Sequence, residues 1–558
     1  MKVRKCSNHA VAMISIGFGL VNRVVKIRGF ALVFSSARFN KAFKNVKNFR
    51  PRNFHALSTS EDSLASSILE EGEATKTPSN FVPYPFAYHQ ELVLTVDTLT
   101  NLGMGICRTE VDVQSCDDLE ETVLPIESRV NSRRKRRRSS GPKDGRNLAD
   151  ECPDLEEANN EGDNQTSSKW VIMVPNVIPG EHVRVRIYRN YKTYSDADLV
   201  DVISPSPNRV TPQCSLFEVC GGCQYQHMSI QTQRQWKQQQ VQDLLERVGQ
   251  LDPDTFPRVL PTCGTDEVYH YRSKITPHYD APHKKSGQEP FIRAIGFKEK
   301  NSRRIVDVAQ CEIATKAINE ELVKLRDQVY TQAKEGTLRR PQKGATLLLR
   351  DANEGVVTDP NQYVTTHVNE IKFRFLAGNF FQNNPFVVPL MVQHVVESAK
   401  KIPIHGKPMT HFIDCYCGSG LFCLSASKLF DVCVGIEVNQ KAIEEAQDTA
   451  QLNNLQNCEF VAASAEAIFE SDQAVQDFPR DQTAVVVDPP RKGCSPEFLQ
   501  QLCNYAPQRV VYMSCDPSTQ ARDAKVLVSN GYEITSALPF DLFPQTRHIE
   551  SLVIFERV

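Results

Sequence analysis

Two side chains near the end of the 558-residue chain have types and positions suited to nucleophilic catalysis with proton transfer. Cys515 ends a strand-like run just before a helix-like run, and the field at a helix N-terminus lowers the pKa of a thiol and favours the thiolate. Glu550 precedes the final strand-like run, at the same edge of the predicted sheet. The alternative for Cys515 is a packed, unreactive thiol.

A turn with two glycines and an acidic residue indicate a ligand that contains a ribose. Asp414–Gly420 (DCYCGSG) is not the G-x-G-x-x-G dinucleotide fingerprint, and no Walker lysine follows it. Glu437 lies 17 residues after Gly420 at the end of the next strand-like run, where an acid accepts hydrogen bonds from ribose hydroxyls. S-adenosylmethionine (SAM) fits this pattern, and so does an ordinary turn with a solvated glutamate.

A proline-containing loop, Asp488–Gly493 (DPPRKG), ends another strand-like run. The prolines stop the strand and stiffen the loop. Asp488 is then placed to contact the ligand or a substrate base, and Arg491 and Lys492 to bind phosphates. A surface turn with ordinary charges is the alternative.

The elements that must position these residues alternate through the C-terminal region, residues 376–558. Strand-like runs are expected at 411–417, 432–438, 458–464, 483–489, 509–515, 532–540 and 551–558. Helical runs are expected at 421–430, 440–454, 496–505 and 517–530. This alternation predicts an α/β domain with a largely parallel sheet, helices on both faces and a ligand beyond the carboxyl ends of the strands.

The rest of the chain divides into segments of distinct composition. We expect a leader at 1–57, a polar linker at 58–84, a β-barrel at 85–212 with a low-complexity insert at 110–167, a Cys-rich linker and helix at 213–260, and an α+β central domain at 261–375. Helices are predicted at 227–248 and near 312–335.

The two strand-like blocks on either side of the insert resemble a TRAM domain, a small RNA-binding β-barrel. The resemblance lies in GMGICR, VPNVIPGEHVRVRI and ADLVDVISPSPNRVTPQC. Arg184, Arg186 and Arg189 could then meet a phosphate backbone, or could simply form the solvated face of a sheet. The Arg-rich run 133–138 is interpreted as part of a solvated loop, with a nuclear localisation signal as the competing interpretation.

The N-terminal composition is typical of a mitochondrial transit peptide. Twelve of the first sixty residues are Lys or Arg, and the first acidic residue is Glu61. A basic tail that lies on RNA is the alternative. Overall, 65 basic residues against 67 acidic ones exclude a wholly basic nucleic-acid binder but not a local basic groove. No apolar run is long enough to predict a membrane-spanning helix.

Four features together resemble the RNA uracil-5-methyltransferase family, which makes 5-methyluridine in tRNA and rRNA. They are the strand ends and the motifs DPPRKG, SCDPSTQARD and FPQTRHIES. The resemblance covers roughly residues 85–558 without the insert, and with the leader it is closest to the animal mitochondrial members. It implies a Rossmann-like class I SAM methyltransferase domain at 376–558, behind a TRAM-like barrel and a central α+β domain. It also implies SAM as cofactor, tRNA or rRNA as partner, no membrane, no obligate protein partner, and the mitochondrial matrix as location.

The chemistry of such a family explains the two residue types. C5 of uracil is too weak a nucleophile to take a methyl group from SAM, but a thiolate that adds to C6 makes C5 electron-rich. A base must then remove the C5 proton so that the thiolate can leave. The resemblance assigns the nucleophile to Cys515 and the base to Glu550, and it requires a flipped-out uridine.

The same resemblance assigns SAM contacts to Gln382, Tyr416, Glu437, Ser464 and Asp488. The alternative for Gln382 is a polar residue just before a helix capped by Asn384 with Pro385 at its first position. The family usually has Asn where this chain has Asp516, and an additional acid there opposes thiolate formation.

A cluster of cysteines suggests a further ligand. Cys214, Cys220 and Cys223, with Cys311 far downstream, resemble the four-cysteine [4Fe–4S] site of one bacterial branch of the family. Structural zinc and four unliganded thiols are the alternatives.

The leading prediction is therefore SAM-dependent methylation of uridine C5 in mitochondrial RNA. The T-loop uridine 54 of tRNA is the first candidate and a small-subunit rRNA uridine the second. Two alternatives remain: an RNA-binding folding factor with little catalysis, and a cytosine-C5 methyltransferase, which would share the thiolate step.

Overall fold

The computed structural model describes residues 77–78, 81–111, 169–284, 287, 289–338, 343–403, 406–464, 469 and 473–558. The predicted leader, most of the linker and nearly all of the insert with its Arg-rich run lie outside these residues. Within the described ranges, no helix is both long and apolar enough to cross a membrane.

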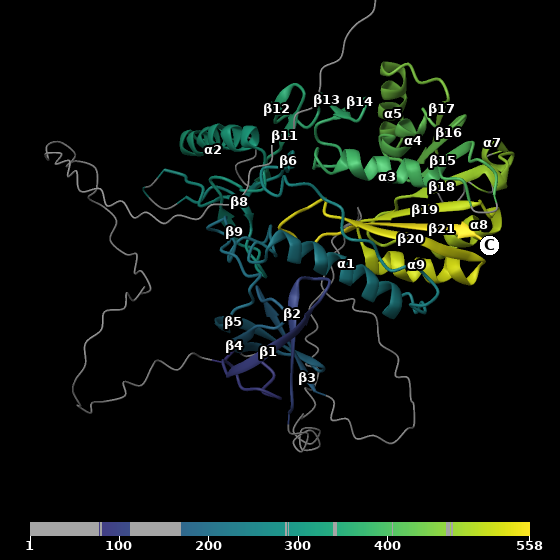
Figure 1. Ribbon diagram of the computed structural model, residues 1–558. Helices are drawn as coiled ribbons and strands as arrows, with labels where there is room; N and C mark the ends of the chain where they lie inside the picture. The colour runs from purple at the N-terminus through teal and green to yellow at the C-terminus, as the bar shows by residue number, and fades with distance from the viewer. Residues whose placement is uncertain are drawn as a thin grey trace, which may run out of the picture. The chain divides into compact units, whose positions relative to one another are not determined.

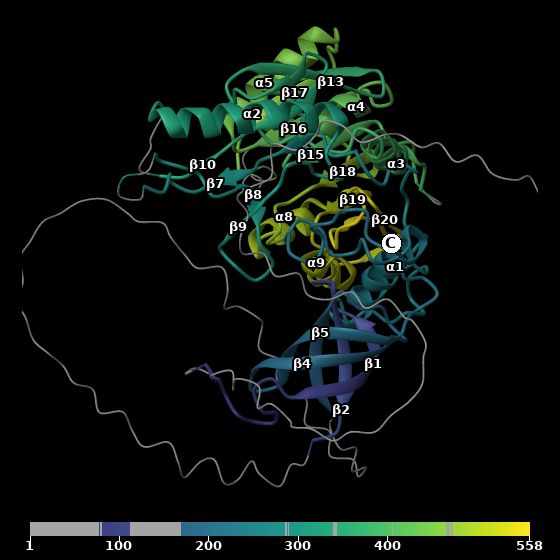
Figure 2. The same ribbon diagram turned by 90° about the vertical axis from the view of Figure 1, so that its left-hand side faces the viewer.

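The first described domain is a closed five-stranded barrel, as predicted, with the strand order β1-β2-β3-β5-β4 (Figure 2). Its strands are β1 (Glu91–Leu99), β2 (Met104–Thr109), β3 (Trp170–Pro175), β4 (His182–Asn190) and β5 (Tyr194–Ser204). On β4, Val183, Val185 and Ile187 are fully buried inside the barrel. The residues between them face outward, because side chains alternate across a strand.

The arginines of β4 contact other side chains on the surface of the barrel. Arg184 pairs with Asp201 at 3.2 Å, and Arg186 pairs with Glu91 at 2.6 Å. The Arg189 guanidinium lies over the ring of the neighbouring Tyr191. These contacts are those of a solvated sheet face, and a role of these arginines in RNA binding stays a prediction.

Helix α1 (Ile230–Arg247) confirms the helix predicted at 227–248. It begins after Ser229, whose side chain accepts a hydrogen bond from the Thr232 backbone N–H. The Gln240 side chain donates to the Thr100 carbonyl at 3.1 Å, in the turn between β1 and β2. Because α1 also packs against α9 (Pro517–Ser529) of the C-terminal domain, it contacts both that domain and the barrel.

The central region consists of short antiparallel strands and one long helix, α2 (Lys316–Glu335), which is the helix predicted near 312–335. The strands are β6 (Lys274–Ile275), β7 (His278–Tyr279), β8 (Ile295–Lys298), β9 (Ile305–Asp307), β10 (Ala345–Thr346), β11 (Leu349–Ala352), β12 (Gly355–Val357), β13 (Tyr363–Val368) and β14 (Ile371–Leu376). The β14 backbone is bound by α5 (Gln440–Leu452): the Arg374 N–H donates to the Thr449 hydroxyl at 3.2 Å.

The C-terminal sheet has seven strands in the order β17-β16-β15-β18-β19-β21-β20 (Figure 1). All seven predicted strands are present: β15 (His411–Cys415), β16 (Val432–Glu437), β17 (Cys458–Ala462), β18 (Thr483–Val487), β19 (Arg509–Ser514), β20 (Tyr532–Phe540) and β21 (Glu550–Arg557). The first five are parallel, but β21 runs antiparallel to both β19 and β20. The segment 541–549 between β20 and β21 contains no helix and is too short for a parallel crossover, so the chain reverses.

Helices cover both faces of this sheet, as predicted (Figure 1). On β18, Ala484 and Val486 pack with α3 and α4, whereas Val485 and Val487 pack with α1, α8 and α9. The helices are α3 (Val388–Lys400), α4 (Leu421–Ala426), α5 (Gln440–Leu452), α7 (Gln473–Gln476), α8 (Pro496–Tyr505) and α9 (Pro517–Ser529), and Arg480–Gln482 form a short 3-10 turn. Helix α4 ends at Ala426, earlier than the helix predicted at 421–430.

The alternative interpretation of Gln382 had a helix with Pro385 at its first position, but helix α3 begins at Val388. The Asn384 side chain accepts hydrogen bonds from the backbone N–H groups of Phe386 and Val387, which closes a separate turn before the helix. Gln382 therefore precedes this turn rather than the helix itself.

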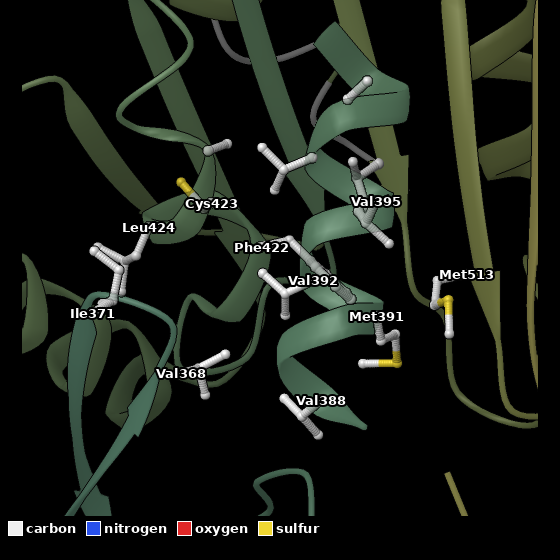
Figure 3. Close-up of a cluster of buried hydrophobic side chains, with 14 of the residues drawn as sticks. Val368, Ile371, Val388, Met391, Val392, Val395, Phe422, Cys423, Leu424 and Met513 are labelled. Carbon is white, nitrogen blue, oxygen red and sulfur yellow. The ribbon is translucent and has the colours of Figure 1, made fainter. Parts of the chain in front are cut away.

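Helix α3 packs on one face of the C-terminal sheet. Figure 3 shows Val388, Met391, Val392 and Val395 of α3 beside Phe422 of α4. Met391 is fully buried. We predict that Met391→Ala lowers the free energy of unfolding by about 2–5 kcal/mol, through lost apolar contact and a residual cavity.

Denaturant titration of full-length protein measures this change. Gln393→Ala, at an exposed position of the same helix, is the control and should change stability by less than about 0.5 kcal/mol. Equal losses in the two variants would contradict the assigned packing.

Candidate active site

A cavity of about 830 Å³ opens beyond the carboxyl ends of β15, β16, β18 and β19. It lies where the strand order reverses, between β15 and β18, which is the position at which open α/β sheets bind ligands. All seven residues predicted for catalysis and cofactor binding line it: Gln382, Tyr416, Glu437, Ser464, Asp488, Cys515 and Glu550. The structure thus gathers them, and their individual roles stay predictions.

The Glu437 carboxylate is held against the turn that follows β15. It accepts hydrogen bonds from the Gly418 N–H at 3.2 Å and from the Asn439 N–H at 2.9 Å. Tyr416, at the start of this turn, has a positive φ of 65°. This backbone reversal brings the β15 turn and the end of β16 to one wall of the cavity, where an acid can meet a ribose.

Glu445 on α5 is a site residue that the sequence analysis missed. It is buried and accepts hydrogen bonds from the Leu376 N–H at 3.0 Å, the Asn379 amide at 2.7 Å and the Ser419 hydroxyl at 2.9 Å. It therefore ties the segment that carries Gln382 to the turn after β15. The sequence held no signal for this role, because an acid on an amphipathic helix is usually solvated.

Burial also raises the pKa of Asp488 in the cavity wall and of Asp414, which is buried in β15 beneath it. Burial raises the pKa of Asp488 to about 7, so that it is close to half-protonated at neutral pH. Burial also holds the pKa of Asp414 well above its usual range, although the Cys423 N–H donates to it at 2.9 Å.

The register of the last strands places the two predicted catalytic residues opposite each other. Ser514 of β19 is the partner of Ser551 in β21. Cys515 follows Ser514, and Glu550 precedes Ser551 in a strand of opposite direction. The thiol and the carboxyl therefore come to the same edge of the sheet from neighbouring strands.

The predicted lowering of the Cys515 pKa by a helix N-terminus is wrong. Burial raises the pKa of this thiol to about 11, and the carboxyl groups of Glu550, Asp488 and Asp516 add to the rise. Only Arg491 opposes them. Desolvation and like charges thus outweigh the helix field in the free protein.

The carboxyl group of Glu550 is also buried, and burial disfavours its ionised form. Burial, followed by the neighbouring Asp488, raises the pKa of the Glu550 carboxyl well above its usual range. Arg491 and Lys237 act in the opposite direction. A raised pKa is typical of a group that exchanges protons near neutral pH.

The predicted metal centre is not supported by the structure. Cys214, Cys220, Cys223 and Cys311 line one cavity of about 790 Å³. However, no group of three or more His, Cys, Asp or Glu side chains in the described part of the chain is arranged to hold a metal ion. Burial raises the pKa of Cys223 to about 12 and of Cys311 to about 11 when no metal ion is bound.

The chain is similar to the tRNA (uracil(54)-C(5))-methyltransferase of Schizosaccharomyces pombe, with 39% identity over 407 residues, which cover 70% of this chain and 75% of that protein. The chain belongs to the tRNA (uracil-5-)-methyltransferase family. The family model with that description matches residues 338–558. The tRNA (uracil(54)-C(5))-methyltransferase of Saccharomyces cerevisiae is 30% identical over 457 residues, which cover 71% of this chain and 70% of the yeast protein.

A solved structure has a similar fold. It is the Pyrococcus abyssi tRNA (uracil-54, C5)-methyltransferase in complex with S-adenosyl-L-homocysteine. It superposes with a TM-score of 0.51 at 23% identity and covers 69% of this chain and 95% of the archaeal one. This tRNA (uracil-5-)-methyltransferase family member therefore shares its fold with that enzyme. The shared fold consists of the barrel, the central region and the α/β domain.

We predict that iodoacetamide alkylates the Cys515 thiol slowly at neutral pH. The alkylation rate should rise about tenfold per pH unit towards pH 11. Iodoacetamide labelling of the full-length protein, followed by mass spectrometry of the peptide that contains Cys515, measures the rate.

Asp516→Asn is the matched variant, because asparagine can still accept the Ser518 N–H that Asp516 accepts at the start of α9. Removal of its charge should speed labelling about threefold, as a pKa decrease of about half a unit would. A wild-type rate that is already constant from pH 7 to 9 would contradict the raised pKa.

Proposed function

We propose that the protein transfers a methyl group from SAM to C5 of a uridine in tRNA, the uridine numbered 54 in the names of the yeast relatives. The observation that carries the proposal is the pairing of β19 with β21, which sets Cys515 and Glu550 at one wall of a cavity. The opposite wall holds Glu437 and the turn after β15. A nucleophile, a base and a cofactor-sized space therefore meet in one site.

The residues at the cofactor wall fit SAM. Glu437 can accept hydrogen bonds from ribose hydroxyls, and Gln382, Tyr416, Ser464 and Asp488 border the remaining space. A volume of about 830 Å³ lies in the range of small-molecule sites. When bound, SAM supplies an electrophilic methyl group on a sulfonium.

Cys515 must first lose its proton. With a pKa of about 11, only about one thiol in ten thousand is ionised at pH 7 in the free protein. Arg491 is the cation that faces both Cys515 and Glu550, and it stabilises the thiolate and the electron-rich base that forms next. Arrival of the substrate is then the event that must favour ionisation.

The bond between the Cys515 sulfur and C6 forms and later breaks. The Cys515 thiolate adds to C6, and the electron pair that reaches C5 attacks the methyl group, whose bond to the sulfonium would break with its electron pair left on that sulfur, so that S-adenosylhomocysteine leaves as a neutral thioether. The Glu550 carboxylate then takes the proton from C5, the Cys515–C6 bond breaks, and the thiolate leaves with its electron pair. Glu550 must be ionised for this last step.

Basic residues at the rim of the cavity support the proposal of an RNA substrate. Arg491 and Lys492 are exposed at the cavity edge, and Arg547 lies in the neighbouring loop. These cations can bind phosphates on either side of a uridine that has left its stack to reach Cys515. The names of the yeast relatives favour tRNA over rRNA, and family membership favours uracil over cytosine.

The location in the mitochondrial matrix is a second part of the proposal. It is supported by the basic composition of residues 1–60, which contain twelve Lys or Arg and no acid. We expect a fluorescent fusion of residues 1–57 to enter mitochondria, and a chain without these residues to stay outside. Matrix localisation of the shortened chain would contradict this part.

The activity is tested with full-length protein, tritiated-methyl SAM and unmodified tRNA transcripts that contain uridine or 5-fluorouridine. Fluorine cannot leave C5 as a proton does, so the wild-type protein should stall as a covalent protein–RNA adduct that carries the label. Cys515→Ala should bind the tRNA but form no adduct.

Mitochondrial small-subunit rRNA fragments serve as the comparison substrate. Adduct on the rRNA alone would overturn the tRNA assignment, and RNA binding without adduct or label transfer on either substrate would favour a folding factor. Labelling of cytidine would favour the cytosine alternative.

A further inference from the structure

One face of helix α9 holds the loop that follows β18. Thr519, Arg522 and Asp523 are spaced three and four residues apart, so they lie on the same side of the helix. Their side chains bind the backbone of residues 491–494, which we call the cationic loop. The first three residues of this loop line the cavity together with Cys515.

Two of these side chains hold the end of the cationic loop. The Arg522 guanidinium donates to the Lys492 carbonyl at 3.1 Å and to the Cys494 carbonyl at 3.3 Å. The Asp523 carboxylate accepts the Cys494 N–H at 2.9 Å and the Tyr512 hydroxyl of β19 at 2.7 Å. Because the Asp523 side chain is only 1% exposed, this anchor lies inside the domain and joins the loop to both α9 and β19.

The third side chain joins the loop to the segment that carries the nucleophile. The Thr519 hydroxyl lies 3.2 Å from the Arg491 carbonyl oxygen and 3.0 Å from the Asp516 carbonyl oxygen. A hydroxyl has one proton, so it shares this proton between the two acceptors. Because Asp516 directly follows Cys515, Thr519 bridges two segments that meet at the cavity wall.

The cationic loop lies very close to α9 at Gly493. This residue has a positive φ of 76°, a conformation that favours glycine. A Cβ atom here would lie 2.6 Å from Nη2 of Arg522 and 2.8 Å from a carboxylate oxygen of Asp523. Glycine meets both demands, so the close contact with α9 is built into the loop.

The side chains of Arg491 and Lys492 depend on this backbone for their position. Both residues are exposed, and in the ranges that the structure describes neither side chain makes a hydrogen bond or an ion pair. The backbone of the loop, which α9 holds, therefore sets the place of their charges. Cations of this kind at the edge of a cavity can bind RNA phosphates, and phosphate contacts position a nucleic acid.

We propose that Thr519, Arg522 and Asp523 are positioning residues of the reaction. They hold the cationic loop at a fixed place beside Cys515, so that an RNA phosphate bound at the loop brings the target uridine to the thiol. This inference rests on the proposed methyl transfer. It assigns to one face of α9 the alignment of the substrate, in addition to its packing role.

The test measures alignment separately from binding. The rate of adduct formation with 5-fluorouridine tRNA, at saturating tRNA and SAM, reports how well the bound uridine is placed. The dissociation constant of the tRNA reports binding alone. Full-length protein is used throughout, and thermal unfolding verifies the fold of each variant.

Thr519→Val is the informative variant, because valine has nearly the volume of threonine but lacks the hydroxyl. Thr519→Ser is the matched control, since serine keeps the hydroxyl. Arg522→Gln is a second variant at an exposed position, where a change of side chain is tolerated well by the fold.

We expect Thr519→Val and Arg522→Gln each to form the adduct about tenfold more slowly than the wild-type protein, because a misplaced substrate reacts slowly. Both variants should bind tRNA within about twofold of the wild-type affinity, because the cations of the loop remain. Thr519→Ser should form the adduct within about twofold of the wild-type rate, because it restores the hydroxyl.

A double-mutant cycle shows whether the effect passes through the loop. Arg491→Gln with Lys492→Gln gives an uncharged loop, which should bind tRNA more weakly and form the adduct more slowly. Thr519→Val in this background should slow the adduct by less than about twofold further, because the cations that it displaces are already absent.

The same loss from Thr519→Val in the protein with the uncharged loop would show a general structural role and overturn the inference. Wild-type adduct rates in both Thr519→Val and Arg522→Gln would overturn it as well. Failure of the wild-type protein itself to form an adduct would refute the proposed function and, with it, the basis of this inference, and that result is distinct from the other two.

Discussion

The antiparallel pairing of β21 with β19 is the constraint on which the site depends. Glu550 begins its strand, so in a fully parallel sheet it would lie at the amino edge, away from Cys515 at the end of β19. Reversal of the last strand, with Ser514 opposite Ser551, brings it to the carboxyl edge. The nine residues between β20 and β21 achieve this because they are too few for a crossover helix.

The second constraint is electrostatic. Cys515, Asp488 and Glu550 all have raised pKa values because burial removes water, and neighbouring carboxyl groups add to the rise for Cys515 and Glu550. Arg491 opposes the rise for both Cys515 and Glu550. The free protein thus favours neutral forms at the reacting centre, and the charges of the reaction appear only as substrate groups replace water.

Much of this architecture could be predicted from the sequence, because apolar strands alternate clearly with amphipathic helices in residues 376–558 and each catalytic motif directly follows or precedes a strand. The reversal of β21 is also visible in the sequence, because the connection 541–549 is too short for a crossover helix. The role of Glu445 depends on a partner distant in the sequence, the backbone of Leu376. The pKa of Cys515 was misjudged because local helix geometry is visible in sequence and burial is not.

The most direct test of this account is the intact mass of the Glu550→Gln protein after incubation with SAM and unmodified tRNA, followed by nuclease digestion. The account predicts a nucleotide bound to Cys515 that already carries the methyl group, because addition and methyl transfer precede the step that needs the carboxylate. Free 5-methyluridine at the wild-type rate, or an adduct without the methyl group, would contradict it.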